Sequence, residues 1–197
     1  MTDSVTTREL LTSWLQQLGV TDITPFNDWL ASASQVTLDK GDMLVRAGDK
    51  SNHLYYLHIG LLRLYYTTPD GKERNKAFYG PGHSLGAASA AITGSTAPFS
   101  IQALEPSHLV RVDFDALYAN AHRHPQMSRA VIQLLSGAFI RNEQREAMLL
   151  TRNAEQRYQW LCENEPELLQ QLPQFHIASY LGVDAVSLSR LKRKHGK

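Results

Sequence analysis

The stretch QFHIASYLGVDAVSLSRLKRK, residues 174–194, has the apolar spacing of two short helices joined by a tight turn. Gly182 lies where such a turn needs a positive φ, and the small Ala178 lets the helices cross closely. Asp184 is placed to cap the second helix, because its carboxylate can accept the free N–H groups of the first turn. The apolar residues line one side of each helix: Ile177, Ala178 and Leu181 in the first, Leu188 and Leu191 in the second. The spacing predicts a helix-turn-helix.

The opposite face of the second helix is polar and basic. Residues 185–197 hold five Lys or Arg and no acid, so this segment carries +5 and the other 184 residues carry −4. Such cations neutralise phosphates, while Arg190 suits a guanine edge and Val186 a thymine methyl. A solvated basic end of an ordinary helix is the alternative. We expect double-stranded DNA as a partner, contacted by Val186, Ser187, Ser189, Arg190, Arg193 and Lys194.

The composition is that of a globular protein, with 43% apolar residues in 197. No apolar run approaches the roughly 18 residues of a membrane span, and the first ten residues lack the pattern of a signal peptide. We therefore expect a cytoplasmic protein. The single cysteine, Cys162, excludes an internal disulfide and a four-cysteine metal site, and we expect it to be a buried structural thiol.

The first two thirds of the sequence change in character from helical to strand-like. Residues 7–18 have helical apolar spacing that ends at Gly19, whereas residues 36–114 form short apolar runs separated by glycines, typical of an all-β roll. Residues 53–79 are predicted as two strands with a turn at residues 69–71. Residues 109–114 are predicted as a half-buried strand, with Val110, Val112 and Phe114 inward and Leu109, Arg111 and Asp113 outward.

A long helix is predicted for residues 125–150, opened by Pro125 and about 40 Å in length. A helix-turn-helix usually binds two half-sites as a dimer, so we expect this helix to pair with a second copy. Burial against the chain's own β-roll is the alternative. The stripe expected to mediate dimerisation consists of Met127, Val131, Leu134, Leu135 and Ala138. Residues 155–172 are predicted to add one helix and a connection.

The order of β-roll, long helix and helix-turn-helix resembles the bacterial Crp/Fnr transcription regulators. Two segments carry the resemblance: IASYLGVDAVSLSRLKRK, residues 177–194, and VTLDKGDMLVRAGDKSNHLYYLHIGLLRLYY, residues 36–66. It implies an α+β fold with three parts: a double-stranded β-helix (jelly-roll) effector domain at 1–124, a dimerisation helix at 125–150 and a DNA-binding domain at 151–197. It also implies a homodimeric, sequence-specific regulator rather than an enzyme, which responds to a small effector and works with RNA polymerase.

The sequence departs from the family at the cyclic-nucleotide phosphate cassette. Gly86 is retained, but Ala87 replaces the glutamate that binds the ribose, and Ala97-Pro98 replaces the Arg-Ser pair that binds the phosphate. A phosphate buried without a cationic partner has little compensation for its lost hydration, so we expect no cyclic AMP binding. We also expect no cofactor and no metal. A remodelled effector pocket is predicted, with Arg141 or Arg145 as further candidates, from His83, Ser84, Gly86, Ala87, Ser89, Thr96, Ala97 and Pro98.

The recognition helix departs as well. Arg190 matches the family, whereas Ala185 and Val186 replace an Arg-Glu pair, so the operator is expected to differ. The sequence ends at Lys197 without the β-hairpin wing of some members, and we expect a short subgroup. Two alternatives stay open: a cupin-like metal-dependent enzyme, for which the pair in His122-Arg123-His124 is the candidate, and a ligand-independent regulator that acts through a protein partner.

Overall fold

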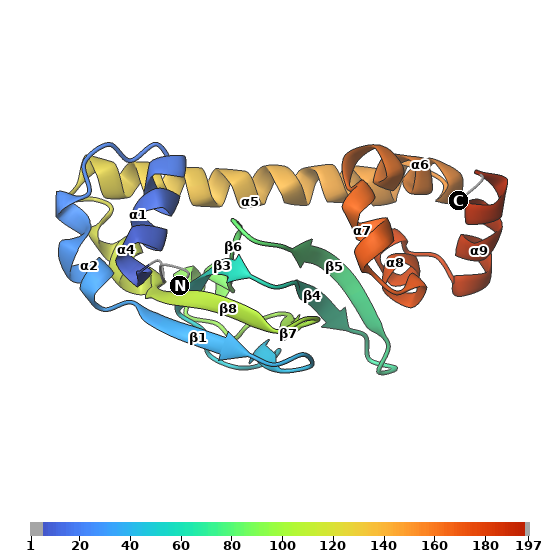
Figure 1. Ribbon diagram of the computed structural model, residues 1–197, viewed down its shortest axis with the longest axis horizontal. Helices are drawn as coiled ribbons and strands as arrows, with labels where there is room; N and C mark the ends of the chain where they lie inside the picture. The colour runs from blue at the N-terminus through green and yellow to red at the C-terminus, as the bar shows by residue number, and fades with distance from the viewer. Residues whose placement is uncertain (1–5, 196–197) are drawn as a thin grey trace, which may run out of the picture. The chain divides into compact units, whose positions relative to one another are not determined.

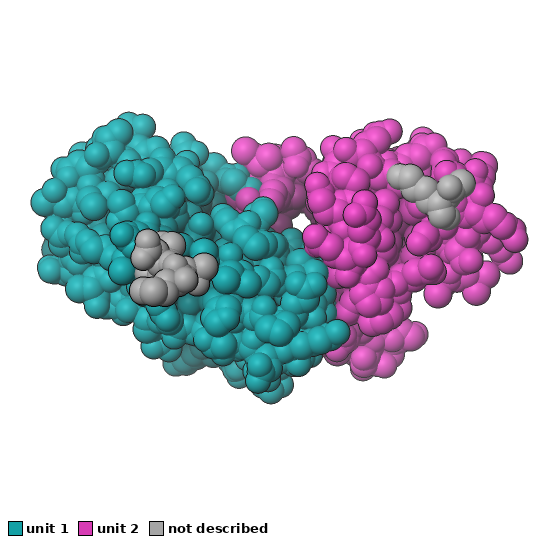
Figure 2. Space-filling model, in the orientation of Figure 1, with its two compact units in different colours: residues 1–66, 78–137 teal, residues 67–77, 138–197 magenta. Residues whose placement is uncertain are grey.

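The structure is a computed structural model that describes residues 6–195, and it confirms the predicted α+β class. The chain divides into two compact units, coloured separately in Figure 2. Unit 1 comprises residues 1–66 and 78–137, and unit 2 comprises residues 67–77 and 138–197. The segment 67–77, which belongs to the predicted effector domain by sequence, is thus grouped with the carboxyl-terminal helices. The predicted domain boundaries at residues 124 and 150 remain predictions.

Two four-stranded antiparallel sheets form the β-roll, in the orders β1-β8-β3-β6 and β2-β7-β4-β5. Most strands are three to seven residues long, as the glycine spacing predicted. Their bounds are β1 Ser34–Leu38, β2 Met43–Val45, β3 His53–Ile59, β4 Leu62–Thr67, β5 Glu73–Tyr79, β6 Ser84–Leu85, β7 Ser100–Ala103 and β8 Ser107–Asp113.

The prediction of two strands for residues 53–79 was wrong, because this segment forms three. Gly60, with φ of 106°, ends β3, and β4 continues in the other sheet. A Cβ atom at Gly60 would lie 2.1 Å from Oγ of Ser107, so only glycine fits this turn. The predicted turn at residues 69–71 is confirmed: Gly71 has φ of 81°, and its N–H donates to the carbonyl of Thr68 at 2.8 Å.

Strand β8 lies between β1 and β3, so it is central in its sheet. Val110 and Val112 face the apolar core formed with the helices, as predicted. Leu109 was predicted to face outward but is only 2% exposed. A central strand covered on both faces has no solvent side, which explains the difference. Phe114 is buried in the same core, as predicted, but it starts a helix instead of ending the strand.

The helical core of unit 1 packs against one face of the β3–β8 pair. It contains α1 (Thr7–Gln17), α2 (Asn27–Ala31), α4 (Phe114–Asn120) and the start of α5, which Figure 1 shows together. A capping box between Thr6 and Glu9 begins α1, as its backbone and side-chain hydrogen bonds show. A short 3-10 turn at Thr24–Phe26 precedes α2, and α3 (Ala88–Thr93) follows β6. The predicted apolar face of α1 is confirmed by burial of Leu11, Trp14 and Leu15.

Helix α5, Pro125–Thr151, confirms the predicted long helix but corrects the predicted use of its apolar stripe. Met127 and Val131 are buried in the core of unit 1, and Leu134 and Leu135 pack against that core. The stripe expected to dimerise is therefore largely covered by the chain's own residues. At 100° per residue, a second apolar stripe lies roughly 110° to 130° around the helix from the first and is exposed. It consists of Ile132, Phe139, Ile140 and Leu150.

Unit 2 contains four further helices after the second half of α5: α6 Ala154–Asn164, α7 Pro166–Gln171, α8 Gln174–Leu181 and α9 Ala185–Lys194. The prediction of one helix and a connection for residues 155–172 is confirmed for α6 but missed α7. Proline disfavours the helical conformation of the residue before it, and Glu165 has φ of −140° and ψ of 51°. The chain therefore turns at Glu165 and starts α7 at Pro166. The described helices include none long and apolar enough to cross a membrane.

Cys162, predicted to be a buried thiol, is only half-buried on α6.

Candidate nucleic-acid interface

Helices α8 and α9 form the predicted helix-turn-helix. Gly182 ends α8 in the left-handed conformation, with φ of 67°, and the N–H of Val183 donates to the carbonyl of Ala178 at 3.0 Å. Leu188 is fully buried and Ala178 nearly so, as the sequence predicted for the residues where the two helices meet. The turn thus holds α9 at a fixed angle to α8.

Asp184 caps α9. Its Oδ1 accepts the N–H of Ser187 at 2.7 Å, and this hydrogen bond holds the pKa of the carboxyl below its usual value. The carboxylate is therefore ionised and committed to the helix terminus. Ser187, one of the predicted DNA contacts, is half-buried beside it.

The outward face of α9 brings most of the predicted DNA contacts together. Val186 is 60% exposed, and Ser189, Arg190 and Arg193 are exposed as well. With Ala185, these residues line a shallow hollow on the surface of the helix. The hollow presents two guanidinium groups, one hydroxyl and one apolar side chain in a single patch. Such a combination can contact both phosphates and base edges.

Lys194 differs from the other predicted contacts, because its charge is already paired. Its Nζ lies 2.7 Å from Oε1 of Glu155 on α6, and Nε2 of His195 lies 3.3 Å from the same oxygen. The hydrogen bond from Lys194 holds the pKa of Glu155 below its usual value. Glu155 lies 39 positions away in sequence, so the spacing within α9 could not show this ion pair.

A second feature of unit 2 is the docking of the hairpin segment 67–77 on α8. The N–H of Asn75 donates to Oγ of Ser179 at 2.9 Å, and that hydroxyl donates to the carbonyl of Glu73 at 3.1 Å. The buried side-chain amide of Asn75 donates to the carbonyl of His176 at 3.1 Å. This contact cannot be read from the sequence, because a polar strand residue carries no signal of its partner.

Arg145 of α5 joins the same cluster. Its guanidinium donates to the carbonyls of Asn75, at 3.2 Å, and of Tyr180, and it stacks on the Tyr180 ring at 3.8 Å from the centroid. Burial lowers the pKa of Arg145. The Tyr180 hydroxyl donates to Oε1 of Glu165 at 3.2 Å, and burial raises the pKa of that carboxyl. Arg145 therefore has a structural role in unit 2, and its pocket role stays a prediction.

The residues predicted to line an effector pocket fall into two groups. Ala87 and Ala97 are buried, and Ala97 exchanges backbone hydrogen bonds with Gly48 and Asp49, at 2.9 and 2.8 Å. A Cβ atom at Gly86 would lie 2.6 Å from the carbonyl oxygen of His53, so this glycine permits close packing. The remaining residues are exposed or half-buried around α3: His83, Ser84, Ser89, Thr96 and Pro98. The pocket stays a prediction.

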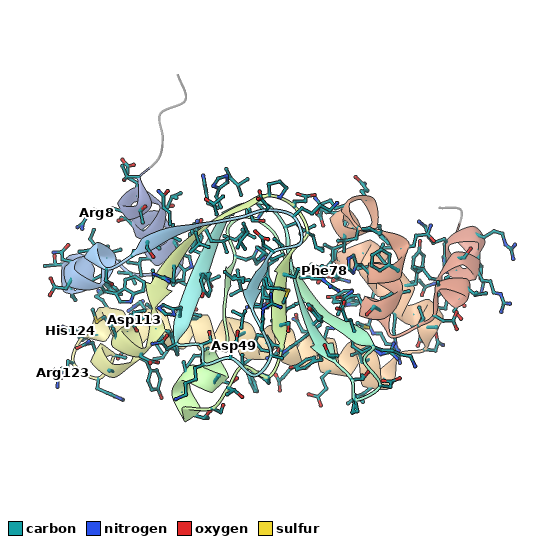
Figure 3. The ribbon with its side chains drawn as sticks, turned by 90° about the horizontal axis from the view of Figure 1, so that it is seen from below. Arg8, Asp49, Phe78, Asp113, Arg123 and His124 are labelled. Carbon is teal, nitrogen blue, oxygen red and sulfur yellow. The ribbon has the colours of Figure 1, made fainter. Side chains whose placement is uncertain are left out.

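The histidine pair considered for a metal lies in the turn between α4 and α5. His122 and Arg123 are exposed and His124 is half-buried, and Figure 3 shows Arg123 and His124 at this end of unit 1. Among the residues that the structure describes, no three metal-ligating side chains cluster.

Comparisons with known proteins identify a family for the β-roll and name similar full-length proteins. The cyclic nucleotide-binding domain family matches residues 35–124. The anaerobic regulatory protein of Haemophilus influenzae is 28% identical over 166 residues, which are 78% of this chain and 63% of that protein. The fumarate and nitrate reduction regulatory protein of Vibrio cholerae is 27% identical, over 78% of this chain and 65% of its own length. This chain thus spans less than two thirds of the length of these relatives.

Among solved structures, FixK2 from Bradyrhizobium japonicum has the same fold. It aligns with a TM-score of 0.69 at 19% identity, covering 83% of this chain and 86% of that one. A fold shared at this identity does not carry function by itself.

Proposed function

Because this chain belongs to the Crp/Fnr family of transcription regulators, we propose that two copies of it bind a specific operator in duplex DNA and so regulate transcription. The observation that carries the proposal is the exposed face of α9, where Arg190 and Arg193 lie beside Val186 and Ser189. The relatives bear the names of regulators, which agrees with the expectation of a protein that is not an enzyme. With this role we also propose that the protein acts in the cytoplasm, where it can reach DNA.

In the proposed complex, α9 enters the major groove and α8 crosses the backbone. Arg193 neutralises phosphate and Arg190 contacts a guanine edge, because a guanidinium can donate two parallel hydrogen bonds to O6 and N7. Ser187 stays beside the backbone at the start of α9, and Lys194 exchanges Glu155 for phosphate. The predicted set of DNA contacts is thereby retained, with Lys194 as its weakest member.

We propose dimerisation through the exposed stripe of α5 instead of the stripe expected from the sequence. Ile132, Phe139 and Leu150 lie on one side of this helix, and the side chain of Phe139 is 61% exposed. Burying such a stripe against a second copy stabilises a pair of helices by removing apolar surface from water. A symmetric pair would also present two copies of α9 to two half-sites, as operator binding requires.

The DNA-binding proposal is tested by selecting bound fragments from a genomic or random library, then measuring affinity at several salt concentrations. Arg190→Ala should weaken operator binding by about 1–3 kcal/mol and relax one base position. Arg46→Ala removes the same exposed charge from unit 1 and serves as the matched control, which should leave affinity unchanged. Equal effects of the two changes, or no selected fragments at low salt, would contradict the proposal.

Dimerisation is tested by sedimentation equilibrium. Phe139→Asp places a charge in the exposed stripe and should convert dimer to monomer, because a buried unpaired carboxylate is costly. Arg141→Gln changes the charge by the same amount at an exposed position of α5 that lies roughly 160° around the helix from Phe139. A dimer that survives Phe139→Asp would contradict this interface, while DNA binding could still be assessed separately.

We further propose that the β-roll senses an effector other than cyclic AMP, or none. Ala87 is buried where the family has its ribose-binding glutamate, and no arginine lies between Arg74 and Arg111 to take the phosphate. Calorimetry should detect no cyclic AMP binding at micromolar concentration. Comparing DNA binding with and without small metabolites, and with purified RNA polymerase, distinguishes an effector-driven regulator from one that depends on a protein partner.

A further inference from the structure

We propose that Val186 recognises the methyl group on C5 of a pyrimidine in the major groove. This inference rests on the proposed DNA-binding function and specifies what one residue of the interface recognises. The protein would then discriminate methylated from unmethylated pyrimidines at one operator position, whichever base pair carries the methyl group.

The first support is the position and exposure of Val186. It is the second residue of α9, in the first turn of the helix, and 60% of its surface is exposed. Recognition helices contact base edges through their amino-terminal residues. Leu188, on the inner side of the same turn, is fully buried and packs between the two helices. The exposed side chain of Val186 is therefore not required for this packing. Valine also favours helices less than most residues do, so its place here is not explained by helix stability.

The second support is the chemistry around Val186. Its side chain has no hydrogen-bonding group and therefore cannot contact the polar edge of any base. The nearest acid along the helix, Asp184, accepts the N–H of Ser187 at 2.7 Å, which commits its carboxylate to the helix terminus. A cytosine amino group at this position would therefore find no carboxylate free to accept its hydrogen bond. Arg190, one turn further, lines the same hollow and offers donors only.

The third support is the set of chemical groups that bases present in the major groove. The thymine methyl is the one apolar group that unmodified B-DNA presents in the major groove. The methyl of 5-methylcytosine occupies the same C5 position on a different base. An apolar side chain senses this methyl through buried area, not through hydrogen bonds, so thymine and 5-methylcytosine should be equivalent to Val186. Uracil and cytosine, which lack the methyl, should both be disfavoured.

The expected size of the effect follows from the area of one methyl group. Burial of one such group changes affinity roughly three- to fourfold. A symmetric dimer contacts two half-sites, so changing both should alter the affinity by roughly tenfold.

The experiment uses the full chain and an operator obtained by selection. Each thymine of the half-site is replaced in turn by uracil, symmetrically in both halves, and affinity is measured by fluorescence anisotropy. One thymine should respond by roughly tenfold. At that position, duplexes with 5-methylcytosine and cytosine, each paired with guanine, should differ by the same factor.

The variant Val186→Ala should abolish both methyl effects, so that it no longer distinguishes thymine from uracil or 5-methylcytosine from cytosine. Val36→Ala, the same truncation at a half-buried position of β1 in unit 1, is the matched control and should keep both effects. If no thymine responds, or if Val186→Ala responds as strongly as the unaltered protein, the inference is overturned although DNA binding stands. If no duplex is bound at all, the proposed function itself fails.

Discussion

The core of unit 1 and the docked hairpin of unit 2 are held together by different kinds of contact. The core joins α1, α2, α4 and the start of α5 to two strands through aliphatic and aromatic side chains, including the stacked rings of Trp14 and Trp29. The hairpin instead meets α8 through hydrogen bonds of Asn75 and through the half-buried guanidinium of Arg145. Apolar burial is non-directional, whereas these polar contacts require one partner at one distance.

The two kinds of contact should tolerate substitutions differently. An apolar core is stabilised by the surface area that it buries. A small change in side-chain shape therefore costs only part of that stabilising free energy. A buried hydrogen bond contributes little net free energy to folding. Removing one partner is nevertheless costly, because the other polar group is then buried without a hydrogen bond. Unit 2 should therefore be the region in which single polar substitutions act locally, while unit 1 responds to lost volume.

The largest effect is expected in unit 1. Leu57→Ala removes a fully buried side chain of β3 and should lower the free energy of unfolding by about 2–5 kcal/mol, through lost burial and the cavity it leaves. Ile59→Ala truncates a neighbour on the same strand that is 49% exposed, and it should cost much less. Urea denaturation measures both, and equal losses would mean that buried side-chain volume in the β-roll does not stabilise unit 1.

A medium effect is expected for Asn75→Ala in unit 2. The change removes the amide that donates to the carbonyl of His176 and should cost about 1–3 kcal/mol. Amide hydrogen exchange by mass spectrometry should quicken in α8 but not in the β3–β8 pair. Arg74→Ala, on an exposed neighbour, is the control. Faster exchange throughout the protein would show that the two regions are not distinct.

A smaller effect, with a defined pH dependence, is expected for Glu165→Gln. Burial raises the pKa of this carboxyl in the folded state, so the folded state holds its proton to higher pH than the unfolded chain does. Stability from this group is therefore present in acid and declines as the pH rises from the ordinary carboxyl pKa through the raised one.

Glu165→Gln should consequently be more stable than the unaltered protein at neutral pH, and the difference should vanish toward about pH 4. Denaturation at several pH values measures this difference. Glu163→Gln, on an exposed position of the preceding helix, should show no such dependence. A stability loss at neutral pH in Glu165→Gln would show that the ionised carboxylate stabilises the cluster.

The smallest effect on stability, and one of opposite sign on DNA binding, is expected for Glu155→Gln. The carboxylate pairs with Lys194 at the surface, so its loss should barely change unfolding. Lys194 would then meet phosphate without first leaving Glu155, so DNA affinity should rise by less than about fivefold per monomer. Glu146→Gln, an exposed acid on α5, is the control. An unchanged DNA affinity would remove Lys194 from the interface.

Local signals in the sequence were sufficient for the helix-turn-helix. The αL conformation of Gly182, the cap at Asp184 and the buried Leu188 each depend on residues within one or two turns. The same holds for the turn at Gly71 and for the start of α5 at Pro125. At these positions the conformational limits of glycine and proline, or one short-range hydrogen bond, determine the structure.

Contacts between residues far apart in sequence could be identified only from the folded structure. The sequence shows apolar residues on both sides of α5, but not that Met127 meets the core while Phe139 stays exposed. It likewise shows Asn75 and Lys194 as polar residues without their partners, which lie 101 and 39 positions away. Helix periodicity fixes which residues share a face, whereas the choice between faces depends on surfaces brought together by folding.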